Sequence, residues 1–448
     1  MNRMVGVLVG IALLLTLAVP ASAEVLTLDK AIEMALENNH ALRAAQYNAS
    51  AANWGLGQAI SGWLPHVYFN SSWSRPDEDT LDEADEYFEM MKAFDPSAKR
   101  TLWEDNYSSS IYLVQPIFNG GAEYVAIHSA AINRETADLA AQDTYLQVAL
   151  EVKKAYYEAL KTKALFRVVT ESLSLARQSL ELANARREVG QATVSDVLRW
   201  EAEVANAEGS LAEADNAFAL AKMALAQVIG EAVDREIELP ELDVSVSPEE
   251  MQQAEMAATA DTEAQTQIGN HPAVQAQDNA VELARVSNLQ SIGALLPNVN
   301  FTYNYSWETN DTMELDGDTA WTMGIGVEIP LFQSFGAVSG IGSTCRQLHA
   351  TRMNVESYRR TFLQRTFAAR LNLRAGRLRV LSAQKATQSA EANLHIVESR
   401  EQLGMANNLE LLDAQLAYKT AQSNLISAIS DFKIALADWE YVTAAADE

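Results

Sequence analysis

Carboxylates are the side chains in this sequence whose number and spacing point most directly to chemistry. The 448 residues include 60 Asp and Glu against 33 Lys and Arg, which gives a formal net charge of −27. Glu410 and Asp413 stand three positions apart after Gly404, so they share one face of a helix. Asp196 follows Gly190 in a similar way. Such groups attract cations and repel anions, although a solvated helix face is the commoner role of an acidic pair.

Other arrangements that carry chemistry are missing from the sequence. The six histidines show no metal-ligand spacing, so surface or capping roles are expected for them and no metal site is predicted. The single cysteine, Cys345, allows no intrachain disulfide. There is neither a phosphate-binding loop nor a Gly-x-Ser-x-Gly motif. With no basic surface for nucleic acid either, we expect no enzyme, no cofactor and no nucleic-acid partner.

The N-terminus has the pattern of a secretory signal. Arg3 precedes an apolar run from Met4 to Val19, and Ala21-Ser22-Ala23 forms a small-x-small cleavage site. A retained anchor is the alternative, but the apolar run is short for one. The sequence therefore predicts a signal peptide at 1–23 and no transmembrane helix in the exported chain.

The chain consists of two repeats. Pro116 and Pro330 are separated by 214 positions, as are Gly190 and Gly404, each pair within similar motifs. Four motifs recur in the same order: Asn39-His40 as Asn270-His271, Gly62-Trp63-Leu64-Pro65 as Ala294-Leu295-Leu296-Pro297, Gln115-Pro116-Ile117-Phe118 as Ile329-Pro330-Leu331-Phe332, and Val189-Gly190 as Leu403-Gly404. This order predicts a first repeat at 24–229, a connector at 230–269 and a second repeat at 270–448.

Strand pairs are expected at about 65–116 and 297–330, with prolines at their entries (Pro65, Pro297) and exits (Pro116, Pro330). Apolar residues alternate with polar ones there, as in the series Val299, Phe301, Tyr303, Tyr305 and Trp307. Each run has about the length of a tilted membrane strand. Ordinary surface hairpins are the alternative, but aromatic residues near the strand ends favour a bilayer. The long acidic connection 75–106 is expected to contain a short helix from Asp82 to Phe94.

Outside the strand pairs the pattern is helical. The segment from Ala122 to Val189 has no proline or glycine and predicts a helix of roughly 100 Å. The segment from Gly342 to Leu403 is its counterpart. It carries an apolar or small residue at every seventh position, the pattern of a coiled-coil seam: Leu348, Val355, Phe362, Ala369, Gly376, Ala383, Ala390 and Val397. Partner helices, Gln191 to Ile229 and Met405 to about Trp439, complete two hairpins with tips near 190 and 404. Shorter helices, Leu28 to Ser61 and Pro272 to Leu295, are expected before the strand pairs.

Four strands are too few to close a barrel. An open strand edge in hydrocarbon leaves unpaired backbone groups, which cost several kcal/mol each. The chain must therefore donate its strands to an oligomeric barrel. Twelve strands from three chains leave room for a channel, and long helices with small seam residues would continue it as a tube.

These ordered motifs resemble those of the TolC-like outer membrane efflux family across essentially the whole mature chain. The resemblance implies a mixed α and transmembrane β fold. Each chain would contribute four strands to a trimeric twelve-stranded outer-membrane barrel, continuous with an α-helical coiled-coil tunnel in the periplasm. It further implies a passive exit duct for efflux or type I secretion. The duct would work with a periplasmic adaptor and an inner-membrane pump.

The same resemblance assigns roles to residues at the tips. It implies that Glu410, Asp413 and Asp196 belong to the periplasmic gate. Gly190, Gly404 and Ser195 would form the tip turns and the adaptor docking site. Ala406 and Glu401 replace an arginine and a tyrosine of the family's tip contacts, which leaves Arg187, Arg199 and Arg400 as three candidates to hold the gate closed. The alternative function is a structural periplasmic coiled coil with surface hairpins.

Overall fold

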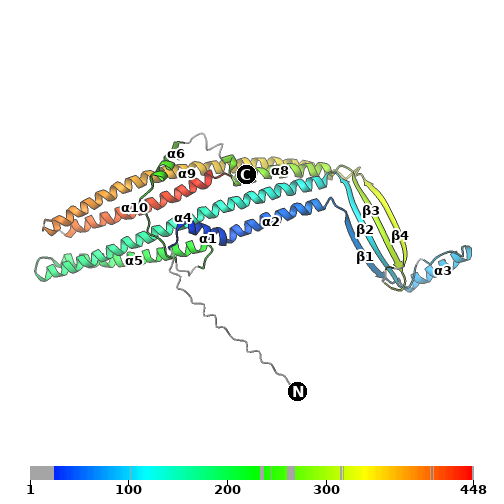
Figure 1. The fold of residues 1–448 in the computed structure, drawn as a ribbon, viewed down its shortest axis with the longest axis horizontal. Helices are drawn as coiled ribbons and strands as arrows, with labels where there is room; N and C mark the ends of the chain where they lie inside the picture. The colour runs from blue at the N-terminus through cyan, green and yellow to red at the C-terminus, as the bar shows by residue number, and fades with distance from the viewer. Residues whose placement is uncertain are drawn as a thin grey trace, which may run out of the picture. The chain divides into compact units, whose positions relative to one another are not determined.

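A computed structural model describes residues 25–100, 102–232, 237–243, 245–259, 268–312, 315, 317–403, 405–406 and 408–445 (Figure 1). The predicted signal peptide and Gly404 lie outside these residues. The chain divides into two compact units. Unit 1 comprises Met1–His40, Leu146–Asp261 and Ala368–Tyr441, and unit 2 comprises Ala41–Tyr145, Thr262–Phe367 and Val442–Glu448.

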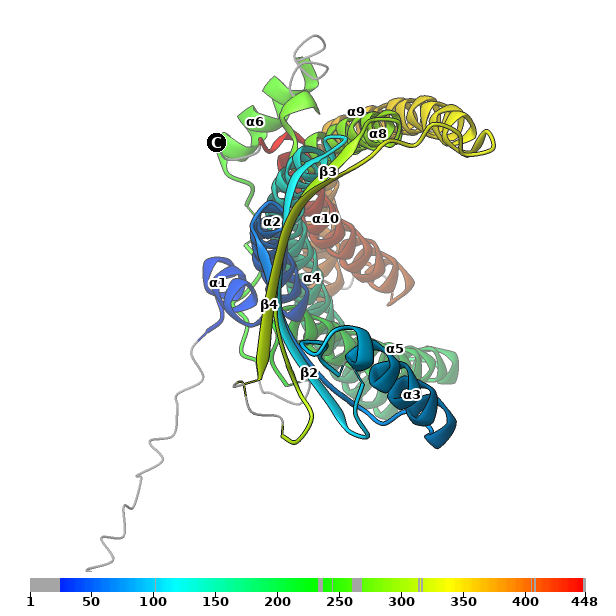
Figure 2. The same cartoon turned by 90° about the vertical axis from the view of Figure 1, so that its right-hand side faces the viewer.

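Unit 2 contains one four-stranded antiparallel sheet. Its strands are β1 (His66–Ser74), β2 (Asn106–Asn119), β3 (Asn298–Thr309) and β4 (Asp318–Glu328), in the spatial order β1-β2-β3-β4. The strands curve along their length (Figure 2). Among the described strands, β1 and β4 each have one edge without a partner.

The strand register separates the sheet into an apolar and a polar face. Ile325 of β4 lies opposite Phe301 of β3, and Tyr305 of β3 lies opposite Ile111 of β2, which in turn lies opposite Phe69 of β1. Residues opposite one another share a face, and alternate residues point to opposite faces. One face therefore carries Val67, Phe69, Trp73, Tyr107, Ile111, Leu113, Val299, Phe301, Tyr303, Tyr305, Trp307, Trp321, Met323, Ile325 and Val327. The other face is mainly Asn, Ser, Thr and Gly.

Helices enter and leave the sheet in the same order in both halves of the chain. Helix α2 (His40–Ser61) precedes β1, and α4 (Ala122–Glu188) follows β2. Helix α8 (Pro272–Gly293) precedes β3, and α9 (Gly336–Gln402) follows β4. Helix α3 (Glu78–Phe94) lies in the β1–β2 connection, at the end of the strands away from α2 and α8 (Figure 1).

Small clusters stabilise the helical part of unit 2. Val274 and Phe362 belong to one cluster, which continues through the 3-10 helix η1 (Ile268–Asn270). Val125, Ile132 and Val286 form another between α4 and α8. His271 is fully buried, and its Nδ1 accepts a hydrogen bond from the Ala273 N–H at 3.2 Å, so it caps α8. This agrees with the capping role expected for a histidine.

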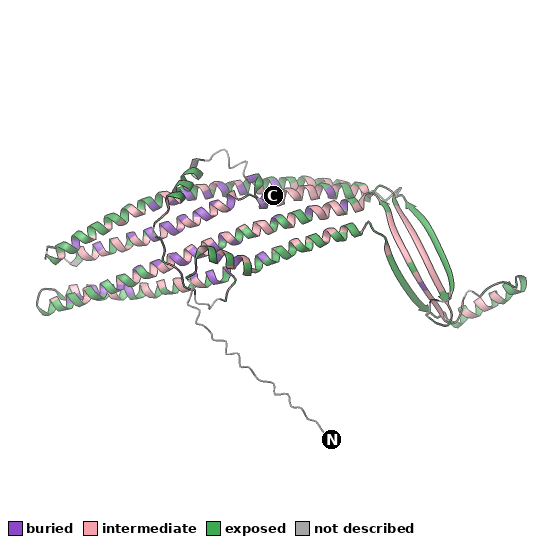
Figure 3. Cartoon of the chain, in the orientation of Figure 1, coloured by how far each residue is buried: buried purple, intermediate pink, exposed green. Residues whose placement is uncertain are grey.

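Unit 1 contains the helical hairpins. Helix α5 (Val194–Val228) returns along α4, and α10 (Asn408–Thr443) returns along α9 (Figure 1). The shorter α1 (Leu28–Asn38) and α6 (Pro248–Thr259) complete the unit. Buried positions form narrow stripes along these helices (Figure 3). Within the described residues, no helix is both long enough and apolar enough to span a bilayer.

The predicted seam of α9 is confirmed. Its members Val355, Phe362, Ala369, Gly376 and Val397 are buried, and the other three are partly buried. A Cβ added to Gly376 would lie 3.4 Å from the Cα of Phe432, so the small residue lets α10 approach closely.

Several predicted boundaries need correction: among them, α3 begins at Glu78 rather than Asp82, and α10 runs to Thr443 rather than Trp439. The expected single helix from Leu28 to Ser61 is two helices, because Asn39 has an extended backbone (φ −66°, ψ 121°). Strand β2 continues through Pro116 to Asn119 with a register irregularity between Pro116 and Phe118, since proline cannot donate a ladder hydrogen bond. Helix α9 begins at Gly336, six residues before the expected start.

Candidate functional site

The two hairpin tips reverse through similar turns. At the first tip, the Gly190 N–H donates to the Arg187 carbonyl at 3.0 Å and the Gln191 N–H donates to the Arg186 carbonyl at 2.8 Å. Gly190 has φ +77°. These two bonds and the left-handed glycine define a Schellman motif, which satisfies the last carbonyls of α4. At the second tip, the Met405 N–H donates to the Arg400 carbonyl at 2.7 Å across the same five-residue span.

Asp196 closes a capping box at the start of α5. Its carboxylate accepts hydrogen bonds from the Thr193 N–H at 2.9 Å and the Thr193 hydroxyl at 2.6 Å. The Asp196 N–H donates in return to the Thr193 hydroxyl at 3.3 Å. The neighbouring Ser195 is exposed. The structure thus gives Asp196 a local role that fixes the tip geometry, in addition to the gate role expected from the family resemblance.

An ion pair joins the two hairpins just above the tips. Arg186 Nη2 lies 2.6 Å from Glu401 Oε1, and only 11% of the Glu401 side chain is exposed. Glu401 occupies the position at which the family resemblance led us to expect a tyrosine. Arg186 is not among the candidates that the sequence offers, which include Arg187 and Arg199, because both Arg186 and Arg187 lie within one turn of the buried Ala183. Within the described residues, Arg187 and Arg199 are exposed and form no ion pair.

Arg400, the third candidate, acts within the second tip. Its Nη2 donates to the Met405 carbonyl at 3.1 Å and lies 3.4 Å from Glu410 Oε2. Asp413, one turn later on α10, is exposed. The structure therefore brings together two candidate gate residues, one paired with a cation and one open to solvent. Ala406 is partly buried in the same turn.

An apolar cluster supports the ion pair. Ala183, Val197 and Trp200 are buried together, and Leu180 and Leu412 pack against them. Leu412 comes from the second hairpin, so this cluster and the Arg186–Glu401 pair both hold the hairpins together.

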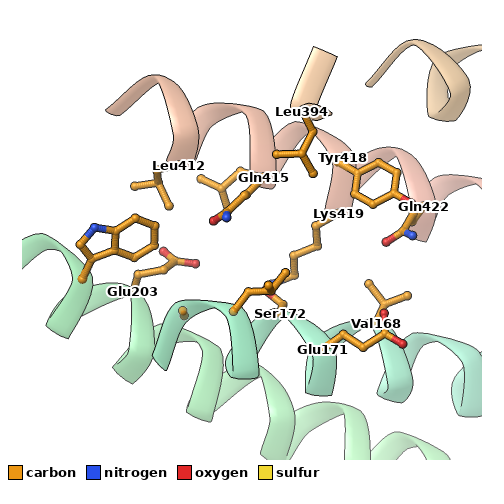
Figure 4. Close-up of a pocket in the computed structure, with 14 residues that line it drawn as sticks. Val168, Glu171, Ser172, Glu203, Leu394, Leu412, Gln415, Tyr418, Lys419 and Gln422 are labelled. Atoms are coloured by element: carbon orange, nitrogen blue, oxygen red, sulfur yellow. The ribbon is translucent and has the colours of Figure 1, made fainter. Parts of the chain in front are cut away.

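A pocket with a cavity volume of about 70 Å³ lies farther along the same hairpins (Figure 4). Trp200 and Leu412 line its end toward the tips, and Lys419 and Glu171 line it farther along. Burial raises the pKa of Tyr418, which also lines the pocket, and the negative charge of Glu391 adds to the effect. Within the described residues, no three His, Cys, Asp or Glu side chains gather in a way that could hold a metal.

Comparison with known proteins identifies the family. The model of the family described as outer membrane efflux protein matches residues 31–231 and 264–439. The chain is 25% identical over 283 residues to the outer membrane efflux protein BepC of Brucella suis, covering 63% of this chain and 59% of that protein. It is 24% identical over 346 residues to the outer membrane protein TolC of Vibrio cholerae, covering 73% and 74%. The match thus spans about three fifths of the length of the first relative.

Solved structures show the same fold. The outer membrane protein VceC of Vibrio cholerae superposes with a TM-score of 0.76 at 20% identity, over 93% of this chain and 96% of that one. CusC, which is described as forming a transmembrane channel, superposes with a TM-score of 0.77 at 15% identity, over 94% of this chain and 92% of that one. Since the family model covers most of the sequence, this chain belongs to the outer membrane efflux protein family and is a protein of the outer membrane.

Proposed function

We propose that three copies of this chain form the exit duct of a tripartite efflux or type I secretion system. The duct conducts substrates passively across the periplasm and the outer membrane. The observation that carries this proposal is the sheet of unit 2, whose four strands share one apolar face between two unpaired edges.

The unpaired edges favour a ring of chains. In a ring of identical copies, strand β4 of one copy pairs with β1 of the next, and this pairing is antiparallel, as the alternating strand directions require. Such a head-to-tail contact closes into a ring when the rotation allows it. Eight strands from two chains would leave an interior filled by side chains, whereas twelve strands from three chains leave a channel. The apolar face then contacts lipid and the polar face lines water.

The helices extend this channel into the periplasm. Helices α4 and α9 each have 67 residues, which corresponds to about 100 Å. In the proposal, 24–229 and 270–448 are two repeats that share one barrel and one tunnel, and 230–269 connects them. The signal peptide 1–23 is removed during export.

The tips form the periplasmic entrance of the proposed duct. Glu410 and Asp413 from three chains bring six carboxylates together and make the entrance attract cations, with Asp196 nearby. The Arg186–Glu401 pair holds the hairpins of each chain in place. Gly190, Gly404 and Ser195 belong to the surface that a periplasmic adaptor contacts, and an inner-membrane pump supplies the energy. The chain itself catalyses no reaction.

The names of relatives agree with an export role. One protein from Pseudomonas putida, 24% identical over 298 residues, is described as a probable efflux pump outer membrane protein.

Dependence on detergent distinguishes this proposal from a structural coiled coil. The apolar sheet face predicts that the purified protein needs micelles and elutes with the mass of three chains plus bound detergent. A protein that stays dispersed without detergent, as a monomer or a dimer, would support the structural alternative instead.

A further inference from the structure

The turns that leave β2 and β4 have similar positive φ angles but different residues. Gly120 and Gly121 follow β2 with φ +59° and +82°, and Ser334 and Phe335 follow β4 with φ +48° and +64°. The two pairs are 214 positions apart, the spacing of the repeat. Each turn also starts its helix with the same hydrogen bond, Val125 N–H to Gly121 carbonyl and Ser339 N–H to Phe335 carbonyl, both at 3.0 Å.

The second turn is strained and uncovered. A bulky residue with positive φ is a genuine outlier, and such strain persists only where surrounding contacts impose it. Within the described chain, the large apolar side chains of this segment are mostly exposed. Phe335 and Phe332 are each 75% exposed and Leu331 is 91% exposed. The two phenylalanine rings contact only each other among the described rings, edge to face at 6.2 Å.

The first turn shows what covers its counterpart. The Gly120 N–H donates to the Pro297 carbonyl at 3.2 Å, and a Cβ at Gly120 would lie 2.1 Å from the Gly293 carbonyl oxygen. The joint between α8 and β3 therefore packs directly on this turn. Strand β2 also continues to pair with β3 down to Asn119, opposite Asn298.

The equivalent joint for the second turn lies at the other edge of the sheet. When the two repeats are aligned, the α8–β3 joint corresponds to the α2–β1 joint, which comprises residues Ser61–Pro65. Trp63 and Leu64 of this joint are 52% and 56% exposed. Both the turn and the joint lie at the end of the sheet where helices begin, on its two unpaired edges (Figure 1).

We propose that the turn after β4 packs on the α2–β1 joint of the next copy of the chain, just as the first turn packs within one copy. This inference rests on the proposed ring of chains. Phe332 and Phe335 then cover the Trp63–Leu64 surface of the next copy, and the Ser334 N–H donates to its Pro65 carbonyl. Segment 329–333 extends β4, which places Gln333 opposite His66 of the next copy.

The residue exchanges between the repeats fit this contact. Phe335 replaces Gly121 and Trp63 replaces Leu295, so larger side chains fill the junction between copies. Within the chain, the backbone of Gly120 lies so close to Gly293 that no side chain fits there. The counterpart of Gly293 in the first repeat is Ser61, which has a side chain. The junction between copies is thus wider in its backbone and closed by aromatic rings. It seals the seam between subunits at the rim where sheet meets helices.

Disulfide trapping tests the contact in a Cys345→Ala background, which leaves no native cysteine. Gln333→Cys with His66→Cys should form an intermolecular disulfide on mild oxidation, whereas Gln333→Cys with Asn70→Cys, four positions away, should not. The pair Gly326→Cys and Ser72→Cys tests whether β4 pairs with β1 farther from the helices. Its register is the one that the β2–β3 pairing predicts through the repeat. If the Gly326–Ser72 pair forms but the Gln333–His66 pair does not, the turn faces lipid and the inference is overturned. If neither pair forms, the proposed ring itself fails.

The substitution Phe335→Gly gives a second test. Relief of backbone strain alone would stabilise the trimer, whereas loss of a ring that seals the junction would destabilise it. Phe335→Gly removes the unfavourable φ and the aromatic ring together. If the ring seals the junction, the trimer should dissociate more readily, with about tenfold more monomer at a given temperature. Phe94→Ala, at an exposed phenylalanine of α3, is the control and should leave the trimer unchanged. A trimer that Phe335→Gly strengthens or leaves unchanged would refute the contact.

Discussion

Neutralising the Arg186–Glu401 ion pair should loosen the proposed entrance. The pair joins the end of α4 to the end of α9, so it restrains separation of the two hairpins. The tests are Arg186→Gln, Glu401→Gln and the double variant. Arg187→Gln is the matched control, since Arg187 is adjacent but exposed.

The expected size of the effect follows from distance and burial. At 2.6 Å and an effective dielectric constant of about 20, Coulomb's law gives an attraction of about 6 kcal/mol. Desolvation of Glu401, which is 11% exposed, and loss of side-chain freedom offset most of this. A net coupling of about 1–2 kcal/mol remains, which corresponds to about a 5- to 30-fold change in the closed-to-open ratio per chain.

Single-channel recording in a planar bilayer measures this ratio as the fraction of time spent open. Both single variants should raise the open fraction, and the double variant should raise it no further than the larger single effect. Arg186→Gln should act more strongly than Glu401→Gln, because it leaves a mostly buried carboxylate without its cation. Additive effects of the two substitutions, or an equal effect of Arg187→Gln, would refute the reasoning.

Three further predictions concern the entrance and the surface loop. Glu410→Gln with Asp413→Asn should weaken block of the channel by multivalent cations, and unchanged block would remove both residues from the entrance. Thr193→Ala should cost about 1 kcal/mol by opening the capping box, measured as a lower thermal unfolding midpoint, whereas an unchanged midpoint would contradict the capping role. Hydrogen bonds, first from Arg75, hold the pKa of Asp105 below 3.8. Because this stabilisation exists above the unfolded pKa and is lost as the pH falls through the lower folded pKa, hydrogen exchange in 75–106 should rise only in acid below about pH 4. Arg75→Gln should weaken that acid dependence without removing it, because the Trp73 indole N–H still donates to Asp105 at 2.9 Å, and an unchanged profile would contradict the role of Arg75.

The periodic spacing of apolar residues predicted most of the fold, because burial within one chain requires that spacing along its helices and strands. Five of the eight residues in the seven-residue series of α9 are buried and three are partly buried, and alternation along β3 and β4 places apolar side chains on one face. The α1–α2 break escaped prediction because Asn39 is not a strong helix breaker and its conformation depends on tertiary contacts. Its Nδ2 donates to the Val228 carbonyl at 3.2 Å, across 189 positions.

The tip contacts were harder to predict than the helices that carry them. Sequence spacing placed Glu410 and Asp413 on one helix face, and Arg400 was among the candidates for a partner. Whether Arg186 or Arg187 reaches the second hairpin depends on the rotation of α4 about its axis. That rotation is fixed by the packing of Ala183 and Trp200, which no local pattern reveals.

Conductance of the purified protein in a planar lipid bilayer tests the proposed duct most directly. A trimer with a twelve-stranded barrel and an acidic entrance predicts discrete conductance steps that prefer cations over anions. The cation preference should fall in the Glu410→Gln, Asp413→Asn variant. A stable trimer that inserts into the bilayer and conducts no ions, or prefers anions, would contradict the account.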